Sequence, residues 1–159
     1  MIFVCLGTQI FQFNRLVKEL DVLVKNGDIK EEIVAQIGAT DYIPKYFQYK
    51  RFMDKEEFES YQDIADVVIS HGGTGALIGA SKKRKNIIAV PRLAKFGEHV
   101  DDHQLQIVKV LESEGYIRAV YDINKLLITL NKALDNPISK SYNRKSDILN
   151  IINEYIRNI

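Results

Sequence analysis

Hydrophobic and polar positions follow two periods along this chain, one typical of buried strands and one typical of amphipathic helices. Short, largely apolar runs that suit buried strands occur at residues 2–6, 32–37, 66–70, 86–90 and 116–120. Residues 46–52 alternate aromatic and polar side chains, which predicts a further strand at an edge of the sheet.

Helix-like stretches lie between these runs. Apolar residues recur at helical spacing from Phe13 to Val24, and Gly27 ends that segment. Asp54-x-x-Glu57 resembles a capping box and predicts a short helix through residue 64. Further helices are predicted at residues 75–83, 101–114 and 122–134. Because strands and helices alternate with short connections, we expect an α/β fold, a Rossmann-like, mostly parallel sheet with helices on both faces.

Aspartates mark the starts of the last two helices in this core. Asp101 or Asp102 is expected to cap one of them, and Asp122 the other, which Pro137 ends. We divide the chain into a domain at residues 1–135 and a C-terminal amphipathic helix within residues 136–159. One face of that helix carries an apolar stripe of Ile148, Ile151, Ile152, Tyr155 and Ile156. We expect this stripe to dock on a partner, with packing on its own domain as the alternative.

Composition and charge narrow the class of protein. A hydrophobic content of 46% is enough for a buried core, and a net charge of +1 argues against a nucleic-acid binder. Because Cys5 is the only cysteine, the chain cannot form a disulfide framework. Its place in an apolar run predicts a buried core thiol. The chain contains no apolar segment near the length of about 20 residues that spans a bilayer, so we expect a cytoplasmic protein. The spacing of the three histidines matches no familiar metal site, and we expect no metal.

Residues 66–75, Asp-Val-Val-Ile-Ser-His-Gly-Gly-Thr-Gly, carry the clearest functional signal. A strand, a glycine-rich turn and a helix start together form a phosphate cradle, because glycines let the backbone approach an anion and the helix N-terminus points its N–H groups at it. His71 and Thr74 place a titratable ring and a hydroxyl on the same rim. Two alternatives remain: a tight turn without a ligand, and a dinucleotide fingerprint read from Gly73 to Gly79.

Three loops are expected to meet at one edge of the sheet. They are Gly7-Thr8-Gln9 after the first strand, the glycine loop at residues 71–75, and residues 91–104. In parallel sheets, ligands bind at the carboxyl ends of the strands, so a nucleotide lying across that edge would touch all three loops.

Read together, residues 2–9, 66–75 and 91–104 resemble the C-terminal, donor-binding half of GT-B glycosyltransferases of the family 28 type. The likeness covers roughly residues 1–135. It is greatest to a small two-subunit subgroup in which the donor half is a separate chain, as in bacterial capsule and exopolysaccharide β-1,4-galactosyltransferases and the eukaryotic dolichol-linked N-acetylglucosaminyltransferase catalytic subunit. The long third loop resembles the bacterial branch.

The resemblance implies specific site residues. His71 and Glu98 are the catalytic candidates. The residues implied in donor binding are Gly7, Thr8, Gln9, His71, Gly72, Gly73, Thr74, Gly75, Arg92, His99, Asp102 and Gln104. In this interpretation His71 adds a positive hydrogen-bond donor, with bracing of the loop as its alternative role. Arg92 neutralises diphosphate or is a surface charge, and Glu98 and His99 act on the sugar or belong to a solvated loop.

The resemblance also implies partners. A UDP-sugar is the donor, a polyprenyl-diphosphate-linked saccharide is the acceptor, and a membrane-anchored chain supplies the acceptor half and the base. The chain would then sit at the inner membrane face through that partner and would need no cofactor. Gly79 departs from the family pattern, since related enzymes have a ribose-binding glutamate there. A non-catalytic UDP-sugar-binding regulator and an NAD(P)-dependent oxidoreductase remain as alternatives.

Overall fold

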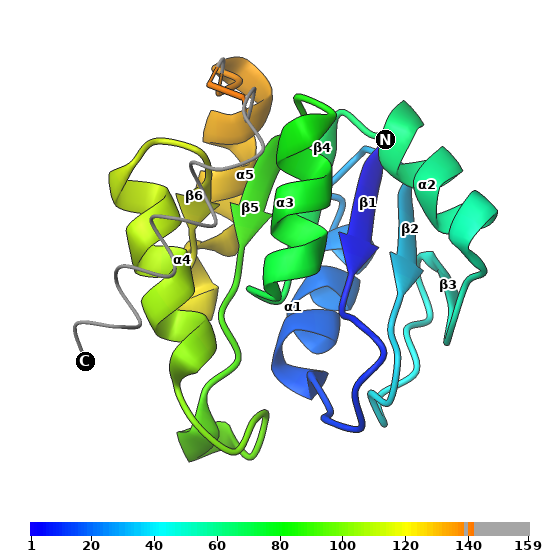
Figure 1. Ribbon diagram of the computed structural model, residues 1–159. Helices are drawn as coiled ribbons and strands as arrows, with labels where there is room; N and C mark the ends of the chain where they lie inside the picture. Colours follow the sequence, from blue (N-terminus) through cyan, green and yellow to red (C-terminus); the bar gives the residue numbers. More distant parts are fainter. Residues whose placement is uncertain (139, 142–159) are drawn as a thin grey trace.

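The computed structural model describes residues 1–138, 140 and 141 as one parallel six-stranded sheet with helices on both faces (Figure 1). The order of the strands is β3-β2-β1-β4-β5-β6. The strands are β1 (Ile2–Cys5), β2 (Ile33–Gln36), β3 (Gln48–Lys50), β4 (Val67–Ser70), β5 (Asn86–Ala89) and β6 (Arg118–Ala119). The helices are α1 (Asn14–Lys25), α2 (Lys55–Ile64), α3 (Thr74–Lys82), α4 (His103–Ser113) and α5 (Leu126–Asp135), with short 3-10 turns η1 (Ala94–Phe96) and η2 (Ile123–Lys125). The predicted Rossmann-like fold is confirmed.

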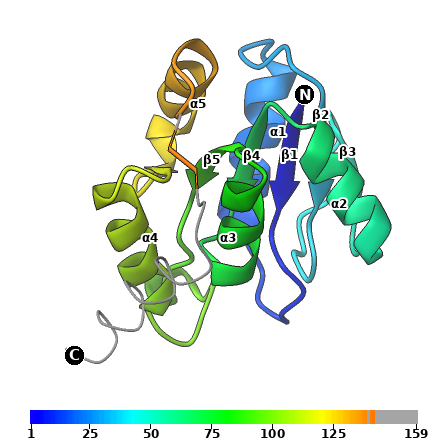
Figure 2. The ribbon, with the colours of Figure 1, turned by 45° about the horizontal axis from the view of Figure 1, so that its top comes forward.

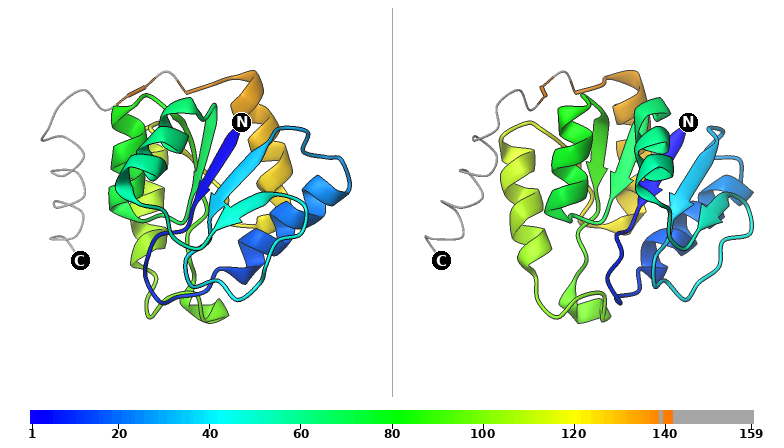
Figure 3. Two further views of the ribbon diagram at one scale, coloured as in Figure 1. Left: turned by 90° about the vertical axis from the view of Figure 1, so that its right-hand side faces the viewer. Right: turned by 45° about the vertical axis from the view of Figure 1, so that its right-hand side comes forward.

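The core lies in two layers because side chains alternate across each strand. On β1, Ile2 and Val4 join the layer that α1 and α5 cover. Phe3 and Cys5 face the other layer, which α2, α3 and α4 cover. Figure 3 shows these two groups of helices on opposite sides of the sheet. All residues of β1, β2, β4 and β5 are buried, as expected for strands covered on both faces.

The boundaries of some elements differ from the sequence prediction. The predicted strand at residues 116–120 pairs with β5 only through Arg118 and Ala119, and β3 is limited to Gln48–Lys50. The exposed edge position of β3 agrees with its prediction. Asp122 caps the 3-10 turn η2 instead of α5, which follows it directly. The predicted C-terminal helix and its apolar stripe lie outside the described residues.

Because all six strands are parallel, their carboxyl ends share the lower edge of the molecule in Figures 1 and 2. The loops after β1, β4 and β5 therefore lie at one edge, as predicted. No helix among the described residues has the length and apolar character needed to cross a membrane.

A buried carboxylate fixes the loop between β2 and β3. Asp21 of α1 is 2% exposed, and one of its oxygens accepts hydrogen bonds from the backbone N–H groups of Lys45 and Tyr46 at 2.9 and 2.8 Å. The other oxygen accepts from the Tyr42 hydroxyl at 2.7 Å. The hydrophobic spacing on α1 did not indicate that Asp21 binds the loop between β2 and β3, because this aspartate lies between two apolar positions.

We expect Asp21→Ala to lower the free energy of unfolding by about 2 kcal/mol, because it removes a charged acceptor of three hydrogen bonds. Denaturant unfolding would measure the change. The matched control is Asp28→Ala, which removes an exposed carboxylate near the end of the same helix. Equal effects of the two substitutions would show that the hydrogen bonds of Asp21 do not stabilise the loop between β2 and β3.

Candidate functional site

The imidazole of His71 lies at the centre of the strand edge. Its Nδ1 is 3.1 Å from the Cys5 carbonyl oxygen at the end of β1. A carbonyl can only accept, so Nδ1 carries the proton and Nε2 is left as an acceptor. Burial and the nearby Arg92 charge lower the pKa of His71 from 6.5 to about 4. His71 is therefore neutral at pH 7 in the free chain, where its contact with Cys5 fits the alternative role as a brace. A positively charged donor at His71 stays a prediction for the donor-bound state.

Two predicted glycines make room for this ring. A Cβ atom at Gly7 would lie 2.9 Å from His71 Cε1, and one at Gly73 would lie 2.8 Å from the same atom. Gly7 also has a φ of +76°, which side chains rarely adopt. The loops after β1 and β4 therefore both close on one imidazole, and neither glycine can be replaced without moving it.

The N-terminus of α3 is open. Gly73 is its N-cap residue, no side chain caps it, and the first turn holds no acidic residue. The first intrahelical hydrogen bond runs from the Leu77 N–H to the Gly73 carbonyl at 3.1 Å. The amides of Thr74, Gly75 and Ala76 precede it and are the groups that a helix leaves unsatisfied. These amides and the helix dipole suit an anion.

A pocket of about 490 Å³ opens beside this N-terminus. Three of the predicted donor-binding residues, Gly7, Thr8 and Gly75, lie on its rim. The end of β2, the loop after β3 and the helices α2 and α3 form the rest of its wall, which consists of Gln36, Met53, Asp54, Lys55, Phe58, Glu59, Gln62, Ala76 and Gly79. The pattern of residues in the sequence did not indicate that α2 forms part of this wall. The one available signal was Gln62, a polar residue four positions after Phe58.

Gln36 holds the pocket rim together. Its Oε1 accepts from the Met53 N–H at 3.1 Å, and its Nε2 donates to the Gly7 carbonyl at 3.5 Å. A Cβ atom at Gly38 would lie 2.7 Å from the same Gly7 carbonyl oxygen. The loops after β1, β2 and β3 are thereby tied to each other.

Arg92 lies beneath the site. Its side chain is fully buried, so the alternative of a surface charge is wrong. One nitrogen, Nη2, donates to the carbonyls of Leu6 and Phe11 at 2.9 and 3.1 Å, while Nε and Nη1 have no hydrogen-bond partner among the described residues. Burial lowers the pKa of Arg92 to about 10, against the opposing effect of Glu98, so the group stays charged at neutral pH. Arg92 braces the first loop and supplies a buried positive charge, and its contact with a donor stays a prediction.

Glu98 is engaged within the protein. It is 1% exposed, and its two oxygens accept from the Nε and Nη2 of Arg15, both at 2.9 Å. One of them also accepts from the Leu93 N–H at 3.1 Å. The solvated-loop alternative is therefore wrong for Glu98. Its geometry argues for fixing the third loop onto α1 and against proton transfer.

The other predicted residues of the third loop, residues 91–104, lie in two different environments. Gln104 accepts from the Arg92 N–H at 3.3 Å, and its Cβ lies 3.3 Å from the position of a Cβ at Gly72, so it belongs with the glycine loop. His99 packs on the ring of Phe11 and lies 3.0 Å from Asp101. Asp101 also accepts from the His103 N–H at 3.0 Å, so it holds the start of α4.

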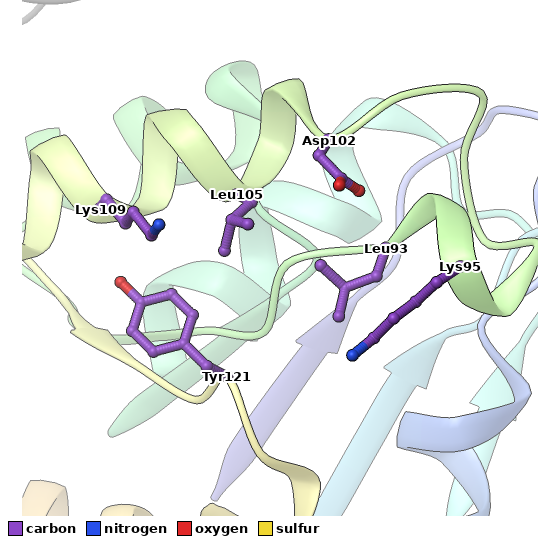
Figure 4. A pocket seen from close by; sticks show the side chains of 6 residues that line it. All are labelled: Leu93, Lys95, Asp102, Leu105, Lys109 and Tyr121. Carbon is purple, nitrogen blue, oxygen red and sulfur yellow. The ribbon is translucent and has the colours of Figure 1, made fainter.

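Asp102 faces a second, separate hollow of about 350 Å³ (Figure 4). Its carboxylate accepts from the Ala94 N–H at 3.0 Å and does not cap α4. The other residues around this hollow are Leu93, Lys95, Leu105, Lys109 and Tyr121. Gln9 is exposed and lines neither hollow. Among residues 1–138, 140 and 141, no three His, Cys, Asp or Glu side chains are placed to share a metal ion.

The sequence matches the glycosyltransferase family 28 C-terminal domain over residues 1–156. A curated relative is the mouse UDP-N-acetylglucosamine transferase subunit ALG13, 29% identical over 90 residues. That match covers 54% of this chain and only 7% of the mouse protein.

Solved structures give the same architecture. An NMR structure of ALG13 matches with a TM-score of 0.57 and 17% identity, covering 99% of this chain and 96% of that one. MurG of Acinetobacter baumannii matches with a TM-score of 0.57 and 16% identity, covering 97% of this chain and 49% of the other. At these identities the likeness concerns the fold.

The neutral state of His71 predicts acid sensitivity. Below pH 6.5 the unfolded chain takes up a proton on His71 while the folded chain does not until about pH 4, so stability is lost as the pH falls through this window. The difference corresponds to on the order of 3 kcal/mol. Denaturant unfolding between pH 7 and pH 4 should show a shallower loss for His71→Gln than for the wild-type chain. The exposed His103→Gln serves as control, and parallel curves for all three proteins would disprove the burial effect.

Proposed function

Because the chain belongs to the glycosyltransferase family 28 C-terminal domain family, we propose that it is the donor-binding half of a two-component inverting glycosyltransferase. The observation that carries this proposal is the glycine loop around His71, which meets a pocket rim at the uncapped start of α3. The chain takes a UDP-sugar and passes its sugar, galactose or another hexose derivative, to a polyprenyl-diphosphate-linked saccharide. The process we propose is capsule or exopolysaccharide synthesis. The printed name of the mouse relative supports a UDP-sugar as the donor class.

In this proposal the donor diphosphate lies against the amides of residues 72–75 and of Gly7 and Thr8. Negative charge grows on the UDP leaving group as the glycosidic bond breaks. N–H donors that are already in place stabilise that charge more in the transition state than in the ground state. The nucleoside then extends into the pocket toward α2.

His71 and Arg92 supply the electrostatic part of this arrangement. Arg92 adds a buried positive charge behind the first loop, with two nitrogens that have no hydrogen-bond partner in the described part of the chain. The unprotonated Nε2 of His71 lies close to Gly73. A bound diphosphate would oppose the desolvation that keeps His71 neutral, so donor binding draws a proton onto the ring and makes Nε2 a donor to the leaving group.

The acceptor-activating base is assigned to the partner. Glu98 accepts hydrogen bonds from Arg15 and Leu93, so it is not free to act as that base. A membrane-anchored subunit that carries the acceptor half would complete the active site and bring the chain to the membrane.

One observation favours a second candidate. Gly79 offers no carboxylate to the pocket where related enzymes hold ribose, which is compatible with a UDP-sugar-binding regulator that does not catalyse transfer. The NAD(P) alternative has less support, because the glycine loop follows β4 and not the first strand of the fold. Measurements of ligand binding and of sugar transfer distinguish the transferase, the regulator and the oxidoreductase.

We expect UDP to raise the melting temperature of the chain by several degrees more than ADP or NADP, because a ligand that binds only the folded state stabilises it. Differential scanning fluorimetry at matched ligand concentrations measures this. Equal shifts for the three ligands, or a shift with NADP alone, would contradict a uridine nucleotide site.

Gly75→Leu should abolish the UDP shift without harming the fold. No atom lies within 4 Å of a Cβ built at Gly75, so the side chain enters open space at the anion site, and leucine favours a helix more than glycine by up to about 1 kcal/mol. The same measurement on Ser113→Leu, which adds this side chain at the exposed end of α4, is the control. A full UDP shift in Gly75→Leu would exclude the start of α3 as the diphosphate site. Gly73 is unsuited to this test, because any side chain there strikes His71.

The purified chain alone should transfer little or no sugar to a polyprenyl-diphosphate-linked monosaccharide, because it lacks the acceptor half. Addition of membranes that contain the partner should restore transfer, measured with a radiolabelled UDP-sugar. Robust turnover by the isolated chain would overturn the two-component proposal. UDP binding without turnover in the presence of the partner would favour the regulator.

A further inference from the structure

Gln62 is a buried amide that the fold does not explain. It lies in the last turn of α2, is 3% exposed, and its Nε2 has no hydrogen-bond partner among the described residues. A buried donor left unpaired lowers the stability of the fold. Its neighbours on α2, Phe58 and Tyr61, pack against the apolar layer of Phe3, so an apolar residue at position 62 would suit the packing. Because the unpaired amide of Gln62 lowers stability, its presence points to a role other than packing.

The amide stands on the wall of the pocket opposite Gly79. Both of its terminal atoms, Nε2 and Oε1, lie 3.8 Å from the place that a Cβ at Gly79 would take. Gly79 lies inside α3 without a positive φ, so its backbone does not require glycine. The amide therefore lies against α3 at Gly79, and both residues line the pocket.

The position along α3 indicates which part of a nucleotide would reach Gln62. Gly79 follows Gly75 by four residues, which is about 6 Å along the helix axis. A nucleotide with its phosphates at the start of α3 therefore brings its ribose level with Gly79 and Gln62. An amide has both donors and an acceptor, so it can pair with two neighbouring hydroxyl groups at once.

We propose that Gln62 holds the ribose hydroxyls of the nucleotide donor, in the place that a carboxylate at position 79 would otherwise serve. This inference rests on the proposed function and names the residue that selects ribose over deoxyribose in that site. Charge gives a reason for an amide here. Asp54 and Glu59 already line the same pocket, and a third carboxylate would add repulsion toward a diphosphate.

The test compares UDP with 2′-deoxy-UDP on the full chain by isothermal titration calorimetry. We expect the wild-type chain to bind UDP about tenfold more tightly, the worth of about one hydrogen bond. Gln62→Met keeps the side-chain length and removes the amide. It should bind the two nucleotides within about twofold of each other, and its melting temperature should stay equal or rise, because no protein hydrogen bond is lost. Gln48→Ala removes an exposed amide on β3 and should keep the wild-type preference.

A rescue variant makes the geometry testable. A Cβ at position 79 fits at an ordinary contact distance from the side chain at position 62, so Gly79→Glu in the Gln62→Met background adds a carboxylate beside it and should restore a preference of about tenfold for UDP. Absence of rescue would overturn the placement of ribose between α2 and α3.

The remaining outcomes separate this inference from the proposed function. If the wild-type chain does not bind UDP, both the role of Gln62 and the proposed function are contradicted. UDP binding with an unchanged ribose preference in Gln62→Met would overturn the role of Gln62 alone, as would a clear drop in its melting temperature. A loss of discrimination between UDP and CDP in Gln62→Met, with the ribose preference intact, would assign the amide to the base and also overturn the proposal.

Discussion

The arrangement of the site depends on one side chain, the neutral imidazole of His71 held between two glycines. Its hydrogen bond to the Cys5 carbonyl joins the end of β4 to the end of β1. Gly7 and Gly73 can approach the ring only because they have no Cβ. Once this contact is made, the amides of the first loop and of the start of α3 face the same space. The Gln36 amide donates a hydrogen bond to the Gly7 carbonyl, and Gly38 leaves room for that carbonyl because it has no Cβ.

The fold could be predicted largely from the sequence because the four central strands are short apolar runs separated by helical periods. Parallel strands bring their carboxyl ends together, so the meeting of Gly7 with His71 followed from topology. The limits of β6 could not be predicted from the sequence. Tyr116 and Ile117 are as buried as strand residues, but only Arg118 and Ala119 are in register with residues of β5.

The parts of the site that were missed depend on contacts between distant positions. Arg15 and Glu98 are 83 residues apart, so nothing local indicated that this carboxylate was committed. A capping box predicted α2 but not which of its faces would line a pocket. Arg92 could be read as a surface charge because sequence carries no information on the depth of a side chain in a loop. The pKa of His71 likewise depends on burial and on Arg92, which only the folded chain brings together.

The buried groups without partners mark where the fold gives up stability. The Nε2 of Gln62, in the last turn of α2, and two nitrogens of Arg92, in the loop after β5, have no hydrogen-bond partner among the described residues. Natural proteins tolerate such costs where a ligand compensates them. These groups, the open helix start and a neutral histidine are the features on which the proposed nucleotide site rests.

An NMR titration of the full chain with UDP tests the central claim most directly. Imidazole nitrogen shifts should show His71 neutral with the proton on Nδ1 and a pKa well below 6.5 in the free protein. Addition of UDP should shift the amide signals of Gly7, Thr8 and residues 72–75 more than those of the second hollow around Lys95 and Lys109. A His71 that titrates near 6.5 in the free chain, or UDP-induced shifts confined to the second hollow, would contradict it.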